Sequence, residues 1–439
     1  MFFRPALFKN RGSFSFALFS RMLPFIFVVI FTSCSKKEFS VPEVNRVVVW
    51  TSCSEFAQYA ELFNKTHSDS PIVVVYKDNP AEALPPAKDE FPPDIIAGPF
   101  LRTDETQKYL KNLDYFFDRR LLTSQSFYPQ LLESGRFHNR LFLLPVSFNL
   151  PVIIFSDSNE SFVTDSYTLS IEQIRSIAAS YNQKNNKGSY TKIGFTPLNN
   201  PDFLYLVTKM NGVDFRDEKN RVVWNEERLN SSVTYMRNWF IKENITAAEE
   251  QNFAFKYLFM PDYRKVTSDR TLFAYTTSDV VFMNMKDLDL NIDYRWIADE
   301  KSILIEDSYM MMGIYKKAGN QSGATEFISW FFDSENQESV LARKSDLNLN
   351  TEIFGIAGGF SALKDVTEHI LPVYYTQLLS NLPPENMMKV PQKLPARWNS
   401  YKSIVVQPYL SDAISAEEGE TVEPISELER EWRRKVFDN

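Results

Sequence analysis

The sequence predicts an α/β fold in which short buried strands alternate with amphipathic helices. Residues 47–50 are three valines and a tryptophan, a run typical of a strand buried on both faces of a parallel sheet. Apolar residues at positions 56, 59, 60 and 63 then recur with helical spacing, and Ser52 or Ser54 can cap that helix. Repetition of this pattern predicts a mostly parallel sheet with helices on both faces.

Later segments repeat the pattern in order. Residues 72–76 and 94–99 are predicted strands separated by proline pairs, and 108–117 has helical spacing. Two extended pieces follow at 141–145 and 152–155. The second half of the chain predicts a helix at 169–181, a strand at 193–195, a helix from Asn200 and a closing helix at 424–436, with Pro424 suited to a first helical position. The three methionines at 310–312 are interpreted as buried strand packing rather than a metal site.

The first 33 residues predict an export signal that lies outside the fold. A basic stretch without acidic residues precedes an apolar core at 22–31, which is too short to span a bilayer. Phe31-Thr32-Ser33-Cys34 resembles a relaxed lipobox of bacterial lipoproteins, in which the cysteine is lipidated and becomes the new amino terminus. We therefore expect lipidation of Cys34 and a polar tether over 34–43. An ordinary secretory signal with an incidental cysteine is the alternative.

Length, charge and cysteine content limit the possible functions. The leader contains four of the 48 basic residues and none of the 56 acidic ones, so the net charge without it is −12 instead of −8. This argues against a nucleic-acid partner, because binding phosphate backbones requires concentrated Lys and Arg. Removing 33 of 439 residues leaves 406, enough for two lobes. With Cys34 lipidated, Cys53 has no partner for an intrachain disulfide, and no later apolar run approaches the ~20 residues of a transmembrane helix.

Several motifs together carry a family resemblance. They are VVVWT at 47–51, LFNK at 62–65, PPDII at 92–96, a proline-flanked passage at 144–155, a strand and Phe/Trp-containing helix at 309–337, and PQKLPARW at 391–398. On these motifs the chain resembles the extracellular solute-binding proteins of the maltose-binding type, which deliver ligands to ABC importers. Phe155-Ser156 departs from the family's usual Tyr-Asn.

The resemblance implies a class II periplasmic-binding-protein-like fold, with two α/β lobes, a hinge and a ligand cleft between the lobes. Residues 44–152 plus 308–345 are then expected in lobe 1. Residues 153–307 plus 346–439 are expected in lobe 2 together with the C-terminal helices. The lobes of such a protein close on a solute at the carboxyl ends of their strands.

Nine residues are candidates for ligand contact by this resemblance and by their place after predicted strands. Trp398 matches a stacking aromatic by position, with core packing as the alternative. Helix capping is the alternative for Asn200 and Asp202, a solvated turn for Ser52 and Glu55, and a surface salt bridge for Arg102. The expected ligand contact of Asn284 depends on a short strand, predicted after residue 272, that enters the cleft. The candidates are Ser52, Glu55, Arg102, Asn149, Asn200, Pro201, Asp202, Asn284 and Trp398.

The sequence predicts a binding protein without a cofactor or metal rather than an enzyme. His67, His138 and His369 are far apart and have no Cys or carboxylate at metal-ligand spacing. No nucleophile elbow, phosphate loop or dinucleotide fingerprint is present. Paired carboxylates for glycoside hydrolysis remain open among the acidic residues.

The resemblance implies the substrate-binding lipoprotein of an ABC importer. Its expected ligand is a small solute, with a sugar or oligosaccharide as the favoured class, and its other partners are the permease subunits and the membrane that the lipid enters. We expect a monomer that faces the periplasm or the cell exterior. A surface lipoprotein that uses the same fold for adhesion or sensing without transport is the alternative, and a saccharide-degrading lipoprotein is a third interpretation.

Overall fold

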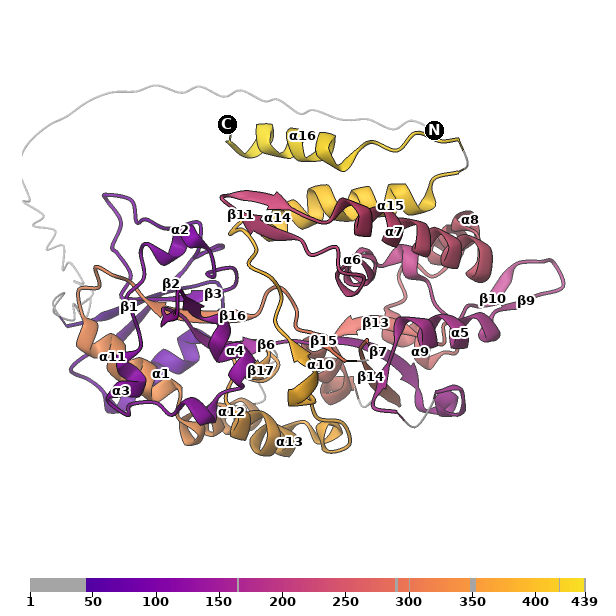
Figure 1. Cartoon of the computed structure of the whole chain (residues 1–439). Coiled ribbons are helices and arrows are strands. Elements are labelled where there is room, and N and C mark those ends of the chain that lie inside the picture. The colour runs from indigo at the N-terminus through magenta and orange to yellow at the C-terminus, as the bar shows by residue number, and fades with distance from the viewer. Residues whose placement is uncertain are drawn as a thin grey trace, which may run out of the picture. The chain divides into compact units, whose positions relative to one another are not determined.

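The strands form two separate sheets in the computed structural model, which describes residues 45–163, 166–288, 291–299, 301–347, 353–417 and 419–437. All of these residues belong to one unit of the chain. The predicted leader, Cys34 and the tether at 34–43 lie outside the described residues. In Figure 1 the first sheet lies on the left and the second on the right.

The first sheet has six strands in the order β17-β6-β16-β3-β1-β2. Strand β1 is buried throughout and pairs in parallel with β2 and β3. Strand β16 is antiparallel to both β3 and β6, and β17 is antiparallel to β6. The strands are β1 (Val47–Thr51), β2 (Ile72–Tyr76), β3 (Ile95–Gly98), β6 (Leu144–Phe148), β16 (Met310–Ile314) and β17 (Phe360–Ser361).

The second sheet has four strands in the order β13-β7-β14-β8. The central strand β7 is antiparallel to β13 and β14, and only the β14–β8 pair is parallel. The strands are β7 (Pro151–Ser156), β8 (Thr168–Leu169), β13 (Ala274–Thr277) and β14 (Ile292–Ile297). The prediction of mostly parallel sheets is therefore wrong. In the first sheet the reason is that the chain returns from the second sheet and enters β16 at the edge where β3 and β6 end.

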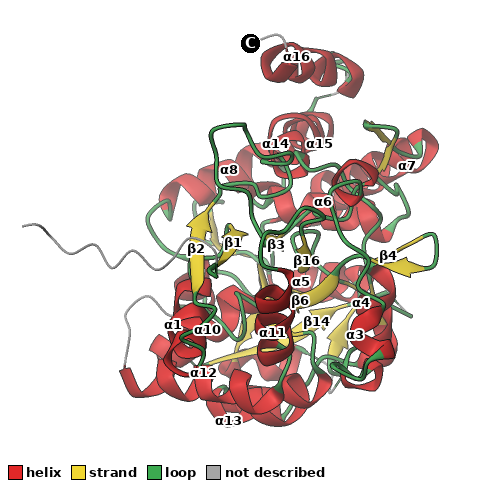
Figure 2. Cartoon of the chain, turned by 90° about the vertical axis from the view of Figure 1, so that its left-hand side faces the viewer, coloured by secondary structure: helices red, strands yellow, loops and turns green. Residues whose placement is uncertain are grey.

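Helices surround both sheets, as Figure 2 shows. The predicted stripe of α1 is confirmed, because Phe56, Tyr59 and Phe63 are buried against aromatic residues of α11. The predicted serine cap is wrong, since Glu55 is the N-cap and makes no capping side-chain bond. Helices on the first sheet's side are α1 (Phe56–Thr66), α2 (Asp104–Gln107), α3 (Tyr115–Asp118), α4 (Pro129–Ser134), α11 (Gln321–Phe331), α12 (Ser334–Leu347) and α13 (Leu371–Tyr374).

The second sheet carries the larger number of long helices. The second hydrophobic cluster combines residues of β7, α5, α6 and α7 with Trp398, Leu410 and Trp432 from the C-terminal helices. These helices are α5 (Ile171–Tyr181), α6 (Pro201–Met210), α7 (Glu226–Arg237), α8 (Ala247–Lys256), α9 (Asp262–Thr267), α10 (Ser278–Leu288), α14 (Trp398–Tyr401), α15 (Gln407–Ser415) and α16 (Ile425–Phe437). The predicted helices at 169–181 and 424–436 correspond to α5 and α16.

Four small strand pairs complete the described structure. The pair β15–β18 is parallel and joins residues that cross between the sheets. The pair β11–β12 is an antiparallel hairpin on the second sheet's side. The strands are β4 (Arg136–Phe137) with β5 (Arg140–Leu141), β9 (Gln183–Lys184) with β10 (Tyr190–Lys192), β11 (Arg216–Glu218) with β12 (Arg221–Val223), and β15 (Ile303–Leu304) with β18 (Met388–Lys389).

Two local predictions are wrong for reasons of tertiary pairing. The predicted helix at 108–117 is interrupted because Leu110 bridges Tyr315 and Lys111 N–H donates to the carbonyl of Ile314 at the end of β16. The predicted strand at 193–195 is reduced to one bridge from Ile193 to Thr271.

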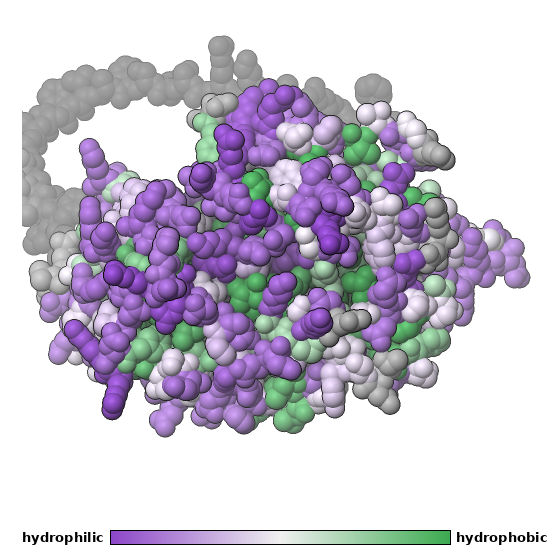
Figure 3. Space-filling model, in the orientation of Figure 1, coloured by the Kyte–Doolittle hydropathy of each residue, from purple (hydrophilic) through white to green (hydrophobic). Residues whose placement is uncertain are grey.

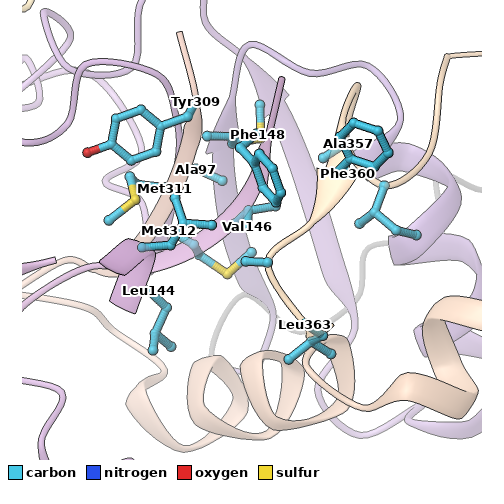
Figure 4. Close-up of a cluster of buried hydrophobic side chains, with 14 of the residues drawn as sticks. Ala97, Leu144, Val146, Phe148, Tyr309, Met311, Met312, Ala357, Phe360 and Leu363 are labelled. Atoms are coloured by element: carbon cyan, nitrogen blue, oxygen red, sulfur yellow. The ribbon is translucent and has the colours of Figure 1, made fainter. Parts of the chain in front are cut away.

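The stretch after residue 345, which was expected in lobe 2, includes a strand of the first sheet. Strand β17 belongs to the first sheet, and Phe354 and Leu363 pack in the first hydrophobic cluster. Figure 4 shows Phe360 near Phe148 of β6, with Met311 and Met312 of β16 on the other side of Phe148. The three methionines of β16 are at most 8% exposed, which confirms their interpretation as strand packing. The stretch after residue 345 also contacts the helices of the second sheet, since Phe354 stacks on Phe282 of α10 at 5.1 Å.

Candidate functional site

Several predicted site residues follow strands that end at one edge of the first sheet. Ser52 and Glu55 follow β1, Arg102 follows β3 and Asn149 follows β6, and β16 begins at the same edge after Tyr309. Parallel-running strands bring their carboxyl ends together, and this is where open α/β sheets bind ligands. Only some of these side chains, however, are directed toward the second lobe.

Glu55 lies inside lobe 1. Its side chain is 1% exposed and forms an ion pair with Lys344 of α12. Lys344 also donates hydrogen bonds to the carbonyl oxygens of Ile353 at 2.9 Å and Gly355 at 2.8 Å. Burial raises the pKa of Glu55, and the attraction of Lys344 opposes this rise. The structure therefore gives Glu55 a structural contact instead of the predicted place in the cleft, while Ser52 is half-buried in the turn after β1.

Cys53 lies in the same turn and is a free, buried thiol. Burial, with a smaller contribution from the Glu55 charge, raises its pKa to about 12. The other cysteine of the chain, Cys34, lies outside the described residues.

Arg102 connects lobe 1 to residues 389–397, which we call the interlobe segment. Its guanidinium donates to the hydroxyl of Tyr309 at 2.9 Å and to the carbonyl of Pro391 at 3.1 Å. The surface salt bridge that was the alternative for Arg102 is replaced by these two bonds. They join the loop after β3 to the start of β16 and to the interlobe segment.

The interlobe segment is bonded to both lobes. On the first side, Lys393 pairs with Asp104 at 3.0 Å and Arg397 pairs with Glu82 at 2.9 Å. Asn79 also donates to the carbonyl of Ala396 at 2.8 Å. On the second side, the N–H of Asp217 in β11 donates to the carbonyl of Lys393 at 2.7 Å. The segment thus occupies the space between the two lobes and connects them.

A buried carboxylate lies beside this segment in the second lobe. Asp307 accepts hydrogen bonds from the hydroxyl of Tyr205 at 2.6 Å, from Lys209 at 2.6 Å and from the indole N–H of Trp398 at 2.9 Å. Burial opposes its ionisation, but the charge of Lys209 and these donors lower the pKa of Asp307 below its ordinary value. We call these four residues the Asp307 network.

The pKa of the neighbouring Glu306 is shifted in the opposite direction. Burial raises its pKa to about 7, although the charge of Lys209 works against the rise. Tyr275 donates to this carboxyl group at 3.4 Å, and the N–H of Glu306 donates to the carbonyl of Asn149. Two adjacent carboxyl groups therefore have different protonation properties at the point where the chain crosses between the lobes.

The start of α6 brings further polar groups to the same region. Asn200 caps the helix through a bond from the N–H of Phe203 at 3.1 Å, and Pro201 is the exposed first residue. Asp202 accepts from Lys402 and from Gln407, both at 2.9 Å. The capping alternative applies to Asn200, whereas Asp202 makes ion-pair and hydrogen-bond contacts with the C-terminal region.

Trp398 is placed in the core instead of on an open surface. Its side chain is 0% exposed and lies between the rings of Tyr205, Phe215 and Tyr401, with centroid distances of 5.9, 5.8 and 5.6 Å. The predicted stacking face is therefore covered, and the residue reaches the site only through its N–H to Asp307.

Asn149 and Asn284 have separate environments. Asn149 lies at the hinge, where it donates to the carbonyl of Gly358 and accepts from Ser278, both at 2.7 Å. Asn284 is half-buried on α10, because residues 278–288 form a helix and not the strand expected there. Buried Val281, Phe282 and Met285 explain that helix, since their spacing buries one helical face.

Sequence reasoning named Trp398 and Asp202 but missed Tyr205, Lys209 and Asp307 itself. Asp202, Tyr205 and Lys209 lie at i, i+3 and i+7 of α6, so one helix face carries all three. This polar spacing on an otherwise apolar helix was the available signal. Nothing local in the sequence indicates that Asp307, about a hundred residues later, meets this face.

The spaces around the site differ in size. A cavity of about 10 Å³ lies among Arg102, Asp307, Tyr309 and Gln392, and one of about 40 Å³ lies beside Lys209. A pocket of about 220 Å³ opens between the loops of lobe 1, the β11–β12 hairpin and α16. Another of about 390 Å³ lies on lobe 1 alone, near Phe127 and Lys364.

Neither metal-binding nor membrane-spanning features occur in the part of the chain that the structure describes. There, no group of three or more His, Cys, Asp or Glu side chains is placed to bind a metal ion. No helix in those ranges combines the length and apolar character needed to cross a bilayer. The face visible in Figure 3 is mainly hydrophilic, with apolar residues in small scattered patches.

Comparison with known proteins finds likeness in structure but not in sequence. No family model matches the chain, and no curated protein matches it. The ABC substrate-binding protein Lmo0181 from Listeria monocytogenes, in complex with cycloalternan, is 13% identical at a TM-score of 0.58, over 89% of this chain and 98% of that one. The fold is that of the class II periplasmic binding proteins.

Two further structures have the same fold. The GacH receptor of Streptomyces glaucescens, studied with acarbose, is 14% identical at a TM-score of 0.59, over 90% of this chain and 98% of that one. Maltose-bound MalE3 from T. maritima is 13% identical at a TM-score of 0.57, over 89% of this chain and 100% of that one. The predicted fold class is therefore confirmed.

Proposed function

We propose that this chain is the solute-binding component of an ABC importer and that its ligand is a saccharide. The observation that carries the proposal is the fold itself. It extends over about nine-tenths of the chain in common with proteins described with cycloalternan, acarbose, maltose and mannotriose. The lobes close on the ligand, and the closed form then docks on the permease subunits.

Polar chemistry between the lobes supports a saccharide ligand. Arg102, Lys209 and Glu306 lie around the residues that cross between the lobes, and no group of side chains suited to a metal ion occurs in the described residues. Carboxylates and amides form hydrogen bonds with sugar hydroxyl groups, and the faces of aromatic rings pack on sugar rings. The chain acts as a receptor without a catalytic step.

Membrane attachment is part of the proposal. Lipidation of Cys34 places the receptor at the membrane surface, facing the periplasm or the cell exterior, as a monomer. Expression of the full chain and of Cys34→Ser, followed by separation of membrane and soluble fractions, tests this. The native chain should sediment with membranes and Cys34→Ser should not, because acyl chains supply the attachment.

Ligand-induced stabilisation tests the receptor function directly. Residues 35–439 should be titrated with maltose, mannobiose, mannotriose and cycloalternan by calorimetry and thermal unfolding. At a hundredfold excess over its dissociation constant, the correct ligand should add about 2.7 kcal/mol to the free energy of unfolding. Absence of binding by every saccharide would contradict the proposal, and release of new reducing ends would indicate an enzyme instead.

A further inference from the structure

The pocket of about 220 Å³ is formed jointly by both lobes and by the last helix, and we call it the rim pocket. Glu82 and Glu105 of α2 line it from lobe 1, the β11–β12 hairpin lines it from lobe 2, and α16 closes its third side. In Figure 1, α16 lies near β11 and α14. The two cavities at the centre of the cleft are more than fivefold smaller. In this conformation, the rim pocket offers the larger space for a ligand.

The wall that α16 contributes is aromatic and fixed in position. The indole N–H of Trp432 donates to Ser400 at 2.9 Å, and its ring meets Tyr401 edge-on at 5.2 Å. The ring of Phe437 packs edge-on against Trp432 at 5.9 Å and is 61% exposed. The guanidinium of Arg397 lies over the Phe437 ring, 5.2 Å from its centroid. Helix α16 thus presents one partly exposed aromatic ring, which the buried Trp432 supports.

The opposite wall supplies a carboxylate, Asp217, one oxygen of which lacks a hydrogen-bond partner, while the backbone of Asn220 is bonded to the group. The Oδ1 atom of Asp217 is buried and has no hydrogen-bond partner among the described residues. Its position is fixed, because the Asp217 N–H is bonded to the carbonyl of Lys393 at 2.7 Å. A buried acceptor without a donor is unfavourable until a ligand supplies one.

The cationic groups of the pocket are already paired. Arg397 is bonded to Glu82 at 2.9 Å, and Arg433 is bonded to Glu429 at 2.8 Å. The pocket therefore has an unmet need for a donor, which favours a ligand rich in hydroxyl groups over an anion. Its volume is below the ~300 Å³ at which pockets for drug-sized ligands begin, so it suits a single small ring.

We infer that the rim pocket binds one sugar ring, with Phe437 packed on the ring and Asp217 accepting from its hydroxyl groups. This inference rests on the proposed function, because it assigns a subsite to the same saccharide. It also makes the C-terminal helix part of the binding site. Because the pocket is lined from both lobes, its occupation favours the conformation in which the lobes are close together.

Calorimetric titration of residues 35–439 with maltose, mannobiose and mannotriose tests the inference. Phe437→Ala and Asp217→Asn should each raise the Kd of the saccharide that binds by about three- to tenfold, since one ring contact or one charged acceptor is lost. Phe437→Tyr keeps an aromatic ring and should retain the affinity. Phe259→Ala is the matched control, because Phe259 is 94% exposed and does not line this pocket.

The outcomes separate the two proposals. If the unmodified chain binds none of these saccharides, the proposed function fails and the subsite fails with it. If the chain binds but Phe437→Ala and Asp217→Asn have the same Kd as Phe259→Ala, only the subsite is overturned. Equal unfolding temperatures of all variants should confirm that the comparison concerns binding and not folding.

Discussion

Two buried ion pairs, one in each lobe, differ in the direction in which the pKa of the acid is shifted. This difference helps to explain why only the pair in lobe 2 lies at the site. Lys344–Glu55 in lobe 1 has side chains 5% and 1% exposed, and Lys209–Asp307 in lobe 2 has 12% and 5%. Burial opposes ionisation of both acids, yet the pKa of Glu55 is raised and that of Asp307 is lowered. Tyr205 and Trp398 give Asp307 additional neutral donors at 2.6 and 2.9 Å.

The difference teaches that burial alone does not decide the role of a carboxylate. Glu55 fixes α12 and, through Lys344, the backbone at 353–355 in the interior of one lobe. Asp307 lines two cavities between the lobes and remains charged because donors surround it. The predictions below test this contrast in order of decreasing effect.

The largest effect is expected from Lys344→Met. Removing the cation leaves Glu55 buried without a counter-charge, which should lower the free energy of unfolding by about 3–5 kcal/mol. Urea unfolding followed by circular dichroism measures this loss. The double variant with Glu55→Gln should recover a large part of it, and a loss below about 1 kcal/mol in the single variant would mean that the pair does not stabilise lobe 1.

Asp307→Asn should cost less, about 2–3 kcal/mol, because the amide oxygen can still accept from Tyr205 or Trp398 and Lys209 has access to water in the pocket. Combining it with Lys209→Met in a double-mutant cycle isolates the charge contribution. Additive losses would contradict a direct interaction between the two side chains.

The sequence could predict the fold class better than the site. The strand at 47–51, the buried stripe of α1 and the helices at 171–181 and 425–437 follow from local periodicity, which the chain satisfies without tertiary information. The site depends on contacts that span 102 residues between Tyr205 and Asp307 and 289 between Arg102 and Pro391. A motif position after a strand could therefore place Glu55 near the cleft but could not predict Lys344 as its partner.

Glu306 gives the free energy of unfolding a pH dependence that ends near neutral pH. Its pKa in the folded chain is about 7, above the ordinary 4.5, so the folded state favours the protonated form. The resulting stability is fully present below pH 4.5 and is lost as the pH rises through 7. Glu306→Gln should remove about 2 kcal/mol of this change between pH 5 and 8, as measured by urea unfolding at each pH.

Glu250 is the matched control for this titration. It is buried at the start of α8, where its carboxylate accepts from Asn199, and burial raises its pKa to about 8. Glu250→Gln should therefore flatten the profile over a window that also begins near pH 4.5 but ends near pH 8, about one pH unit above the end of the Glu306 window. Identical profiles for the two variants would contradict the assignment of the change that ends near pH 7 to Glu306.

The smallest effect on stability is expected at the interlobe segment. Lys393 and Arg397 form exposed or half-exposed pairs, so replacing each by Ala should change the free energy of unfolding by less than about 1 kcal/mol. The double variant should nevertheless increase the radius of gyration in solution X-ray scattering, because these pairs join the two lobes. Lys65→Ala breaks a pair within α1 and should leave the radius unchanged.

The turn after β1 has a practical consequence through Cys53. A thiol that is covered and has a pKa of about 12 is almost entirely protonated at neutral pH and is therefore a poor nucleophile. It can pass through an oxidising compartment without forming mixed disulfides. In a chain whose other cysteine is replaced by serine, only molecules that expose residue 53 can be alkylated. The rate of alkylation of Cys53 therefore measures how often the first sheet opens.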